Sequence, residues 1–220
     1  MATAARIGPN AVLQHLAVLD AEIGVAWRGA LLHLADVREP PATAGMLNED
    51  EVARLHHAVR LYVPDRASAI QRAAGLATAD YILANRIPRA AQLLIRTLPA
   101  PLGARVLAAA IARHAWTFAG SGRFRVRSHA PLWFEIADNP LAQHAAPHPV
   151  CDWHAAVFER LFATLVWPAA SVTETSCCAT GAPYCRFVIT PRRGADGAVS
   201  APARAAPQGM RWPVPVRDHG

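Results

Sequence analysis

The sequence predicts an α+β protein, in which an N-terminal helical half is followed by an antiparallel β-β-α-β-β half. Three observations predict this fold class. Apolar residues recur at helical spacing through residue 118. From Gly120-Ser-Gly122 onward the apolar period changes to two, which is typical of strands. Helical spacing returns over residues 151–167, between two pairs of β-prone runs, so an antiparallel sheet can pack one face on helices.

Turn and capping residues divide the first 118 residues into helices. Asn10 follows Gly8-Pro9, where a proline at the helix start loses no hydrogen bond, and Asn48 can cap a later helix. Pro64 begins another helix, which Pro88 ends or kinks. The expected helices span residues 10–23, 48–62, 64–87 and 99–118. We therefore expect the first 118 residues to be all-helical.

Four short β-prone runs predict the sheet, and they lie near residues 124–126, 132–136, 171–177 and 184–190. Arg123, Arg125 and Arg127 alternate with apolar residues, so as a strand they would line one solvated face. Residues 1–190 are expected to form one α+β domain, with a helical part (1–118) and a sheet part (119–190). Residues 191–220 are aperiodic and rich in Gly, Ala, Pro and Arg, which predicts a disordered tail.

Composition excludes several classes of protein. Hydrophobic residues make up 53% and charged residues 17% of the chain, against roughly 25% charged in an ordinary soluble domain, which excludes a disordered or coiled-coil protein. All basic residues behind the net charge of +6 are arginines, and they are scattered, so nucleic acid is not expected as a partner. The longest apolar run, residues 106–112, is far shorter than the roughly 20 residues of a membrane span. No secretory signal is recognised, and we expect a cytoplasmic protein with reduced thiols.

Four potential metal ligands lie in the last third of the chain. Cys151, Glu174, Cys177 and Cys185 would offer three thiolates and one carboxylate, which suit a closed, tetrahedral, structural Zn²⁺ site. The spacing alone leaves buried cysteines without a metal as an equal alternative. His154 lies about one helical turn after Cys151 and is expected to be a neighbour of the site, not a ligand.

Glu174-x2-Cys177-x7-Cys185, with Cys151 upstream, resembles the zinc motif of the 4-vinyl reductase domain family. The resemblance implies an α+β fold and these four zinc ligands. Cys178 has no place in the motif and is expected to be a buried or half-buried thiol. The family also includes ligand-sensing domains of aromatic-responsive transcription activators, which are joined to further modules.

A longer resemblance covers nearly all of residues 1–190. Segments 6–10, 78–88, 114–122 and 151–162 are similar to the J-type 4-vinyl reductase proteins of the bacteriochlorophyll pathway in purple phototrophs. This resemblance implies a role at the reduction of the 8-vinyl group (formerly numbered 4-vinyl) of divinyl protochlorophyllide or chlorophyllide. It assigns no role to residues after 190.

Three functions are compatible with this resemblance: a tetrapyrrole-binding carrier or accessory factor, the reductase itself, and a small-molecule-sensing regulatory domain. Vinyl reduction needs a hydride or two electrons, which proteins take from a cofactor. No G-x-G-x-x-G follows a predicted strand, and no NAD, flavin or iron–sulfur site is recognised. The carrier is therefore the favoured function, and a chain of this length leaves no room for the modules of a sensor.

A Mg-chlorin ligand would need an axial imidazole and polar anchors for its carboxylates. His114 could bind the Mg²⁺ beside Trp116 and Phe118, and Arg113 or Arg123 could meet a propionate. The alternative is that His114 is an ordinary core or surface histidine. Other bacteriochlorophyll-pathway enzymes are the expected protein partners, and a homodimer and a peripheral association with the photosynthetic membrane are left open.

Overall fold

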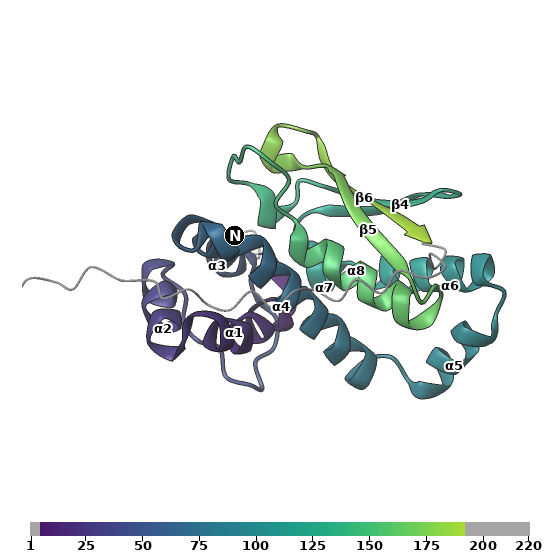
Figure 1. Cartoon of the computed structure of the whole chain (residues 1–220), viewed down its shortest axis with the longest axis horizontal. Coiled ribbons are helices and arrows are strands. Elements are labelled where there is room, and N and C mark those ends of the chain that lie inside the picture. Colours follow the sequence, from purple (N-terminus) through teal and green to yellow (C-terminus); the bar gives the residue numbers. More distant parts are fainter. Residues whose placement is uncertain (1–4, 192–220) are drawn as a thin grey trace, which may run out of the picture.

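The computed structural model describes residues 5–191, and its first half is built from helices (Figure 1). Seven helices precede the sheet: α1 (Asn10–Ile23), α2 (Val25–Leu34), α3 (Glu49–Tyr62), α4 (Pro64–Asn85), α5 (Arg89–Thr97), α6 (Ala100–Arg113) and α7 (Trp116–Ala119). In the view of Figure 1, α1 to α3 lie at one end of the molecule, and α5 and α6 lie at the other. None of the described helices is both long and apolar enough to cross a membrane.

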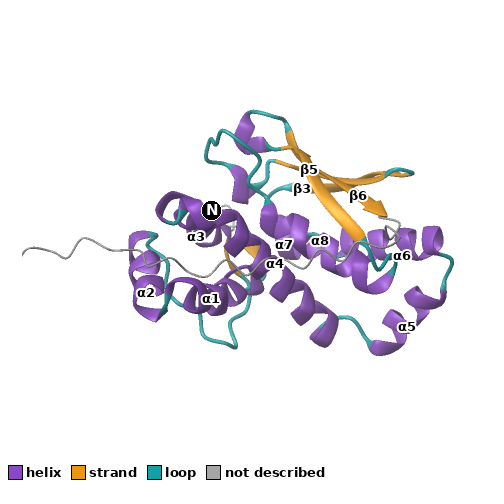
Figure 2. Ribbon diagram, viewed as in Figure 1, coloured by secondary structure: helices purple, strands orange, loops and turns teal. Residues whose placement is uncertain are grey.

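The second half has the predicted β-β-α-β-β order. Its elements are β3 (Arg123–His129), β4 (Leu132–Ala137), the 3₁₀ helix η1 (Pro140–Ala142), α8 (Asp152–Leu165), β5 (Ala170–Ser176), the 3₁₀ helix η2 (Cys178–Thr180) and β6 (Tyr184–Pro191). The strands form an antiparallel sheet in the order β3-β4-β6-β5, with α8 against one face (Figure 2). The predicted α+β class is confirmed.

Two helix starts follow the predicted signals. The Asn48 side chain accepts a 2.9 Å hydrogen bond from the backbone N–H of Asp50 and so caps α3. Three acidic residues in the first turn of α3 also favour the positive end of the helix dipole. Pro64 occupies the first turn of α4, where it needs no N–H partner.

The expectation of an all-helical first half is wrong in three places. Two-residue strands, β1 (Arg6–Ile7) and β2 (Leu47–Asn48), pair antiparallel, and elements this short show no apolar period. Helices α2 and α5 follow breaks at Gly24 and Pro88, where the sequence predicted no new helix. The long helix expected over 99–118 ends at Arg113, and α7 is a separate turn of helix.

The two faces of the sheet differ in chemistry. Phe134, Ile136, Phe187 and Ile189 are buried on the face that covers α8. The predicted solvated face of β3 is confirmed, because Arg123, Arg125 and Arg127 are exposed while the intervening residues are half-buried. These alternating environments explain the period-two pattern.

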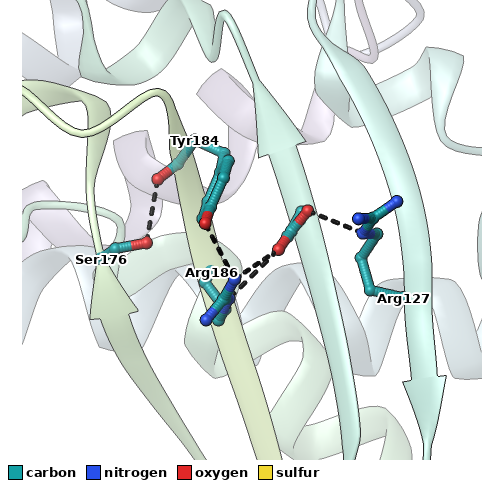
Figure 3. Close-up of polar contacts among 5 residues, drawn as sticks. Arg127, Ser176, Tyr184 and Arg186 are labelled. Atoms are coloured by element: carbon teal, nitrogen blue, oxygen red, sulfur yellow. Dashed lines mark hydrogen bonds and ion pairs between the residues drawn. The ribbon is translucent and has the colours of Figure 1, made fainter.

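A polar network runs across three strands on the opposite face of the sheet (Figure 3). The Glu135 carboxylate accepts hydrogen bonds from Arg186 at 2.9 and 3.1 Å and pairs with Arg127 at 3.1 Å. Arg186 also donates to the hydroxyl of Tyr184 and lies over its ring. Glu135 is buried, and the two guanidinium groups compensate its charge.

Helices α4 and α8 join the two halves by a close approach. A Cβ atom at Gly75 would lie 2.5 Å from the carbonyl oxygen of Trp153 and 2.8 Å from the Cβ of Ala156. Glycine therefore allows the two helix backbones to touch. The predicted disordered tail, residues 191–220, lies outside the described residues except for Pro191, which is the last residue of β6.

Candidate metal centre

Three elements and their ends bring four potential ligands together. Cys151 immediately precedes α8, Glu174 lies in β5, Cys177 follows β5 and Cys185 lies in β6. One ligand atom from each residue lies within 4.8 Å of all the others. The Cys151 Sγ atom is 3.5 Å from the Cys185 Sγ and 3.9 Å from the Cys177 Sγ, and the last two sulfurs are 3.8 Å apart.

These sulfur distances match the edges of a small tetrahedron. Three thiolates that each bind one Zn²⁺ at about 2.3 Å would stand about 3.8 Å apart in tetrahedral geometry. The three described distances bracket this value without any movement of the backbone. The cluster could therefore hold a tetrahedral ion, with a carboxylate oxygen as its fourth ligand.

Glu174 carries an oxygen without a partner. Its Oε2 accepts a 2.8 Å hydrogen bond from the backbone N–H of Cys151, but its Oε1 is buried and has no hydrogen-bond partner among the described residues. Burial, together with the negative charge of Cys177, raises the pKa of the Glu174 carboxyl to about 8. A bound cation would supply the missing partner and favour the carboxylate.

The thiols show the same need for positive charge. Burial raises the pKa of the Cys151 thiol well above its usual value, and hydrogen bonding with Cys151 and Cys177 raises that of Cys185. Hydrogen bonds from these two thiols lower the pKa of Cys177, so negative charge in the protein alone concentrates on one sulfur. Because metals bind thiolates and carboxylates, a divalent cation would remove the cost of burying all four anions.

Two N–H donors support the sulfur atoms. The Asn139 amide nitrogen lies 3.3 Å from the Cys151 Sγ and 3.4 Å from the Cys185 Sγ, and it donates toward both. The backbone N–H of Cys178 donates to the Cys185 Sγ at 3.3 Å. Donors of this kind stabilise thiolates and orient metal ligands. Sequence reasoning missed Asn139, although its position as the cap of η1 was a signal that could have drawn attention to it.

Arg60 of α3 contributes a positive charge close to the cluster. Burial lowers the pKa of its guanidinium, while the negative charges of Cys151 and Cys177 act in the opposite direction. Its Nη2 donates to the Leu141 carbonyl at 3.2 Å, and its Nη1 is buried without a hydrogen-bond partner among the described residues. Sequence reasoning missed Arg60 because it is far from the ligands in the chain.

The two other residues considered for the centre lie outside the ligand set. Cys178 is half-buried, as expected, and its Sγ lies 3.9 Å from the Ile136 carbonyl oxygen. His154 is buried, and its Nε2 lies 3.3 Å from the Phe118 carbonyl oxygen. His154 is thus a neighbour on α8 that does not share the ligand cluster, as the sequence predicted.

The five residues predicted for a chlorin fall into two environments. Arg113, His114 and Trp116 are exposed near the end of α6 and in α7. Phe118 packs inward, with its ring 5.3 Å from that of Phe124, and Arg123 pairs with Asp138 at 2.7 Å. None of the five lines the cavity of about 310 Å³ that lies between α3, α4 and residues 144–150.

The comparisons with known proteins agree with this architecture. The model of the 4-vinyl reductase domain matches residues 132–191, which contain all four clustered ligands. The chain is 58% identical over 192 residues to the bacteriochlorophyll synthase 23 kDa chain of Cereibacter sphaeroides, covering 87% of this chain and 93% of the relative. It is 54% identical over 187 residues to the protein of the same name from Rhodobacter capsulatus, covering 85% of this chain and 88% of the relative.

A solved structure shares the fold at low sequence identity. An H-NOX protein from K. algicida superposes with a TM-score of 0.52 at 11% identity, covering 86% of this chain and 98% of that protein. This similarity concerns the fold alone. The predicted resemblance to the 4-vinyl reductase domain family is confirmed by the domain match and by the two relatives. The chain belongs to the family of the bacteriochlorophyll synthase 23 kDa chains and contains a 4-vinyl reductase domain.

Proposed function

We propose that this protein binds a Mg-chlorin and carries it at the reduction of the 8-vinyl group of divinyl protochlorophyllide or chlorophyllide. The observation that carries this proposal is the identity of 58% over 192 residues with a protein named for bacteriochlorophyll synthase. That relationship supports a role in bacteriochlorophyll biosynthesis. The step and the ligand are our inference from the residues below.

The metal centre has a structural role in this proposal. Zn²⁺ would be held by Cys151, Cys177, Cys185 and Glu174, and it would supply a fixed link between the start of α8 and the β5–β6 hairpin. Support comes from the sulfur distances and from the Glu174 oxygen that lacks a partner. Four protein ligands leave no position for water, which is typical of structural zinc.

The sheet favours a carrier over a nicotinamide-dependent reductase. Dinucleotides bind at the carboxyl ends of parallel strands in βαβ units. All strand pairs of the described residues are antiparallel, so the described part of the chain contains no such unit. A separate reductase of the pathway would then provide the hydride.

His114 has the geometry of a metal-binding imidazole. Its Nδ1 lies 2.9 Å from the Ala110 carbonyl oxygen, which can only accept, so Nδ1 carries the proton. Nε2 therefore presents its lone pair, and no partner of Nε2 is found among the described residues. The exposed Trp116 indole is two residues away and could cover one face of a macrocycle. An exposed ligand site suits a protein that passes its ligand on.

Chlorin binding is tested with the purified full chain and Mg-chlorophyllide, followed by absorption spectroscopy. We expect a complex that survives moderate salt, because its formation buries apolar surface. His114→Ala should shift the absorption and weaken binding while the metal content stays unchanged. His129→Ala, at another exposed histidine, is the matched control.

The outcomes separate the candidate functions. Turnover of divinyl chlorophyllide with NADPH by this chain alone would replace the carrier with the reductase. No binding of any chlorin would exclude both, and binding of a small aromatic ligand in its place would favour a sensor. We also propose a cytoplasmic protein that meets other pathway enzymes, with light scattering as the measurement that detects a homodimer.

A further inference from the structure

Helices α5 and α6 form a pair at the end of the molecule away from α1 to α3 (Figure 1). We infer that the outer surface of this pair, which we call the α5–α6 surface, binds a membrane with anionic lipid headgroups. Arg89, Leu93, Leu94, Leu102 and Arg105 are the residues that carry the inference. It does not depend on the chlorin-binding function.

Large apolar side chains are exposed on both helices. Leu93 and Leu94 of α5 are 64% and 57% exposed, and Leu102 of α6 is 46% exposed. Val106 of α6, one turn after Leu102, is also exposed. Exposed apolar residues that recur in this way mark interaction surfaces rather than an ordinary solvated face.

These side chains are not held by the core of the helix pair. Ile95 is the buried residue of α5, and it lies against Gly103 of α6, whose added Cβ would be 3.0 Å from the Ile95 carbonyl oxygen. Leu107 and Ile111 continue the buried face of α6. The exposed leucines therefore lie outside the helix–helix contact and are available to another surface.

The same segment carries one sign of charge. Residues 81–134 contain eight arginines and no aspartate or glutamate. Within the described range, Arg89 and Arg105 have no acidic partner at ion-pair distance, in contrast to Arg123 and Arg127 at the far end of the segment. The α5–α6 surface thus combines unpaired positive charge with exposed leucine side chains.

An anionic lipid surface fits both features together. Guanidinium groups form paired hydrogen bonds with phosphate, and leucine side chains enter the boundary between headgroups and acyl chains. A second copy of this chain would place arginine against arginine in a twofold contact, which like-charge repulsion opposes. An acidic protein would satisfy the arginines without requiring the four exposed apolar side chains.

The test is sedimentation of the full chain with vesicles of phosphatidylcholine alone and of phosphatidylcholine with phosphatidylglycerol. We expect binding to the anionic vesicles only, weakening as salt rises. Arg89→Gln with Arg105→Gln should lower the partition coefficient at least about tenfold, since each arginine near such a surface contributes roughly a factor of five. Leu93→Gln with Leu94→Gln should lower it as well.

Matched variants separate the surface from net charge and from misfolding. Arg38→Gln with Arg125→Gln removes the same charge elsewhere, and Val25→Gln removes an exposed apolar side chain of α2. Both should bind like the parent, and circular dichroism should show that every variant is folded. Equal binding to neutral vesicles, no binding to anionic vesicles, or an equal loss in the Arg38/Arg125 variant would overturn the inference. An acidic protein as the true occupant would give the second of these results.

Discussion

The backbone N–H of Cys151 donates a 2.8 Å hydrogen bond to Oε2 of Glu174, and this bond joins the start of α8 to the middle of β5. It fixes the Glu174 carboxylate beside three cysteine sulfurs while Oε1 stays without a partner. One residue of the cluster thus orients another before any metal is considered.

Removing one sulfur should release the metal, whereas removing the neighbouring thiol should not. We expect about one zinc per chain by elemental analysis, and its loss in Cys185→Ala, because that change leaves three ligands. The melting temperature should fall, since binding of a structural metal contributes directly to folding free energy. Cys178→Ala is the control, as the Cys178 Sγ lies outside the ligand set, and it should retain the metal. Iron with acid-labile sulfide in the parent would contradict the zinc assignment.

Asn139 should tune the affinity for the metal without binding it. Asn139→Asp keeps the oxygen that accepts from the Leu141 N–H but places a second negative oxygen beside the sulfurs of Cys151 and Cys185. Zinc affinity, measured by competition with a chelator, should fall by roughly 10- to 100-fold. Asn85→Asp makes the same chemical change at an exposed position and should have no effect. An unchanged affinity in Asn139→Asp would remove Asn139 from the account of the site.

Gly75 should tolerate no side chain. In Gly75→Ala the new Cβ would meet the Trp153 carbonyl oxygen at 2.5 Å, so α4 and α8 must move apart. We expect a loss of about 1–3 kcal/mol in the free energy of unfolding, the usual range for overpacking. The same change at Gly29 in α2 meets nothing within 4 Å and should stabilise by roughly 0.5–1 kcal/mol through helix propensity. Denaturant unfolding of both variants checks this, and equal effects would refute it.

Stability should fall as the pH drops below about 6.5 because His15 is buried in its neutral form. Burial lowers the pKa of His15 from 6.5 to about 4, so the unfolded chain binds a proton over this range before the folded protein does. The contribution of His15 is complete above pH 6.5 and is lost as the pH falls toward 4. Between pH 7 and pH 5 this amounts to about 2 kcal/mol.

The His15→Gln variant isolates this contribution. Its unfolding free energy should depend less steeply on pH between 7 and 5 than that of the parent, whatever its absolute stability. His33→Gln, at an exposed histidine of α2, should follow the slope of the parent. Parallel curves for the parent and His15→Gln would show that another group is responsible for the acid sensitivity.

Local sequence patterns predicted much of the fold because they reflect local physics. The cap at Asn48 and the proline at the start of α4 act within one turn of helix, so each is visible in a few residues. Strands β3 to β6 were predicted because one face of each is buried, which imposes the period of two. Helices α2 and α5 were missed, since each begins directly after a break that was interpreted only as an end.

The sequence by itself determined the α+β order, the four-ligand motif and the family, because each depends on residue identity and spacing along the chain. Only the tertiary structure decided which groups surround those ligands. Arg60 and Asn139 reach the cluster from other elements, and their roles arise from distances across the fold that spacing along the chain does not encode. The structure likewise placed His114 and Trp116 on the surface and Phe118 in the core, because burial is a property of packed elements and not of a motif.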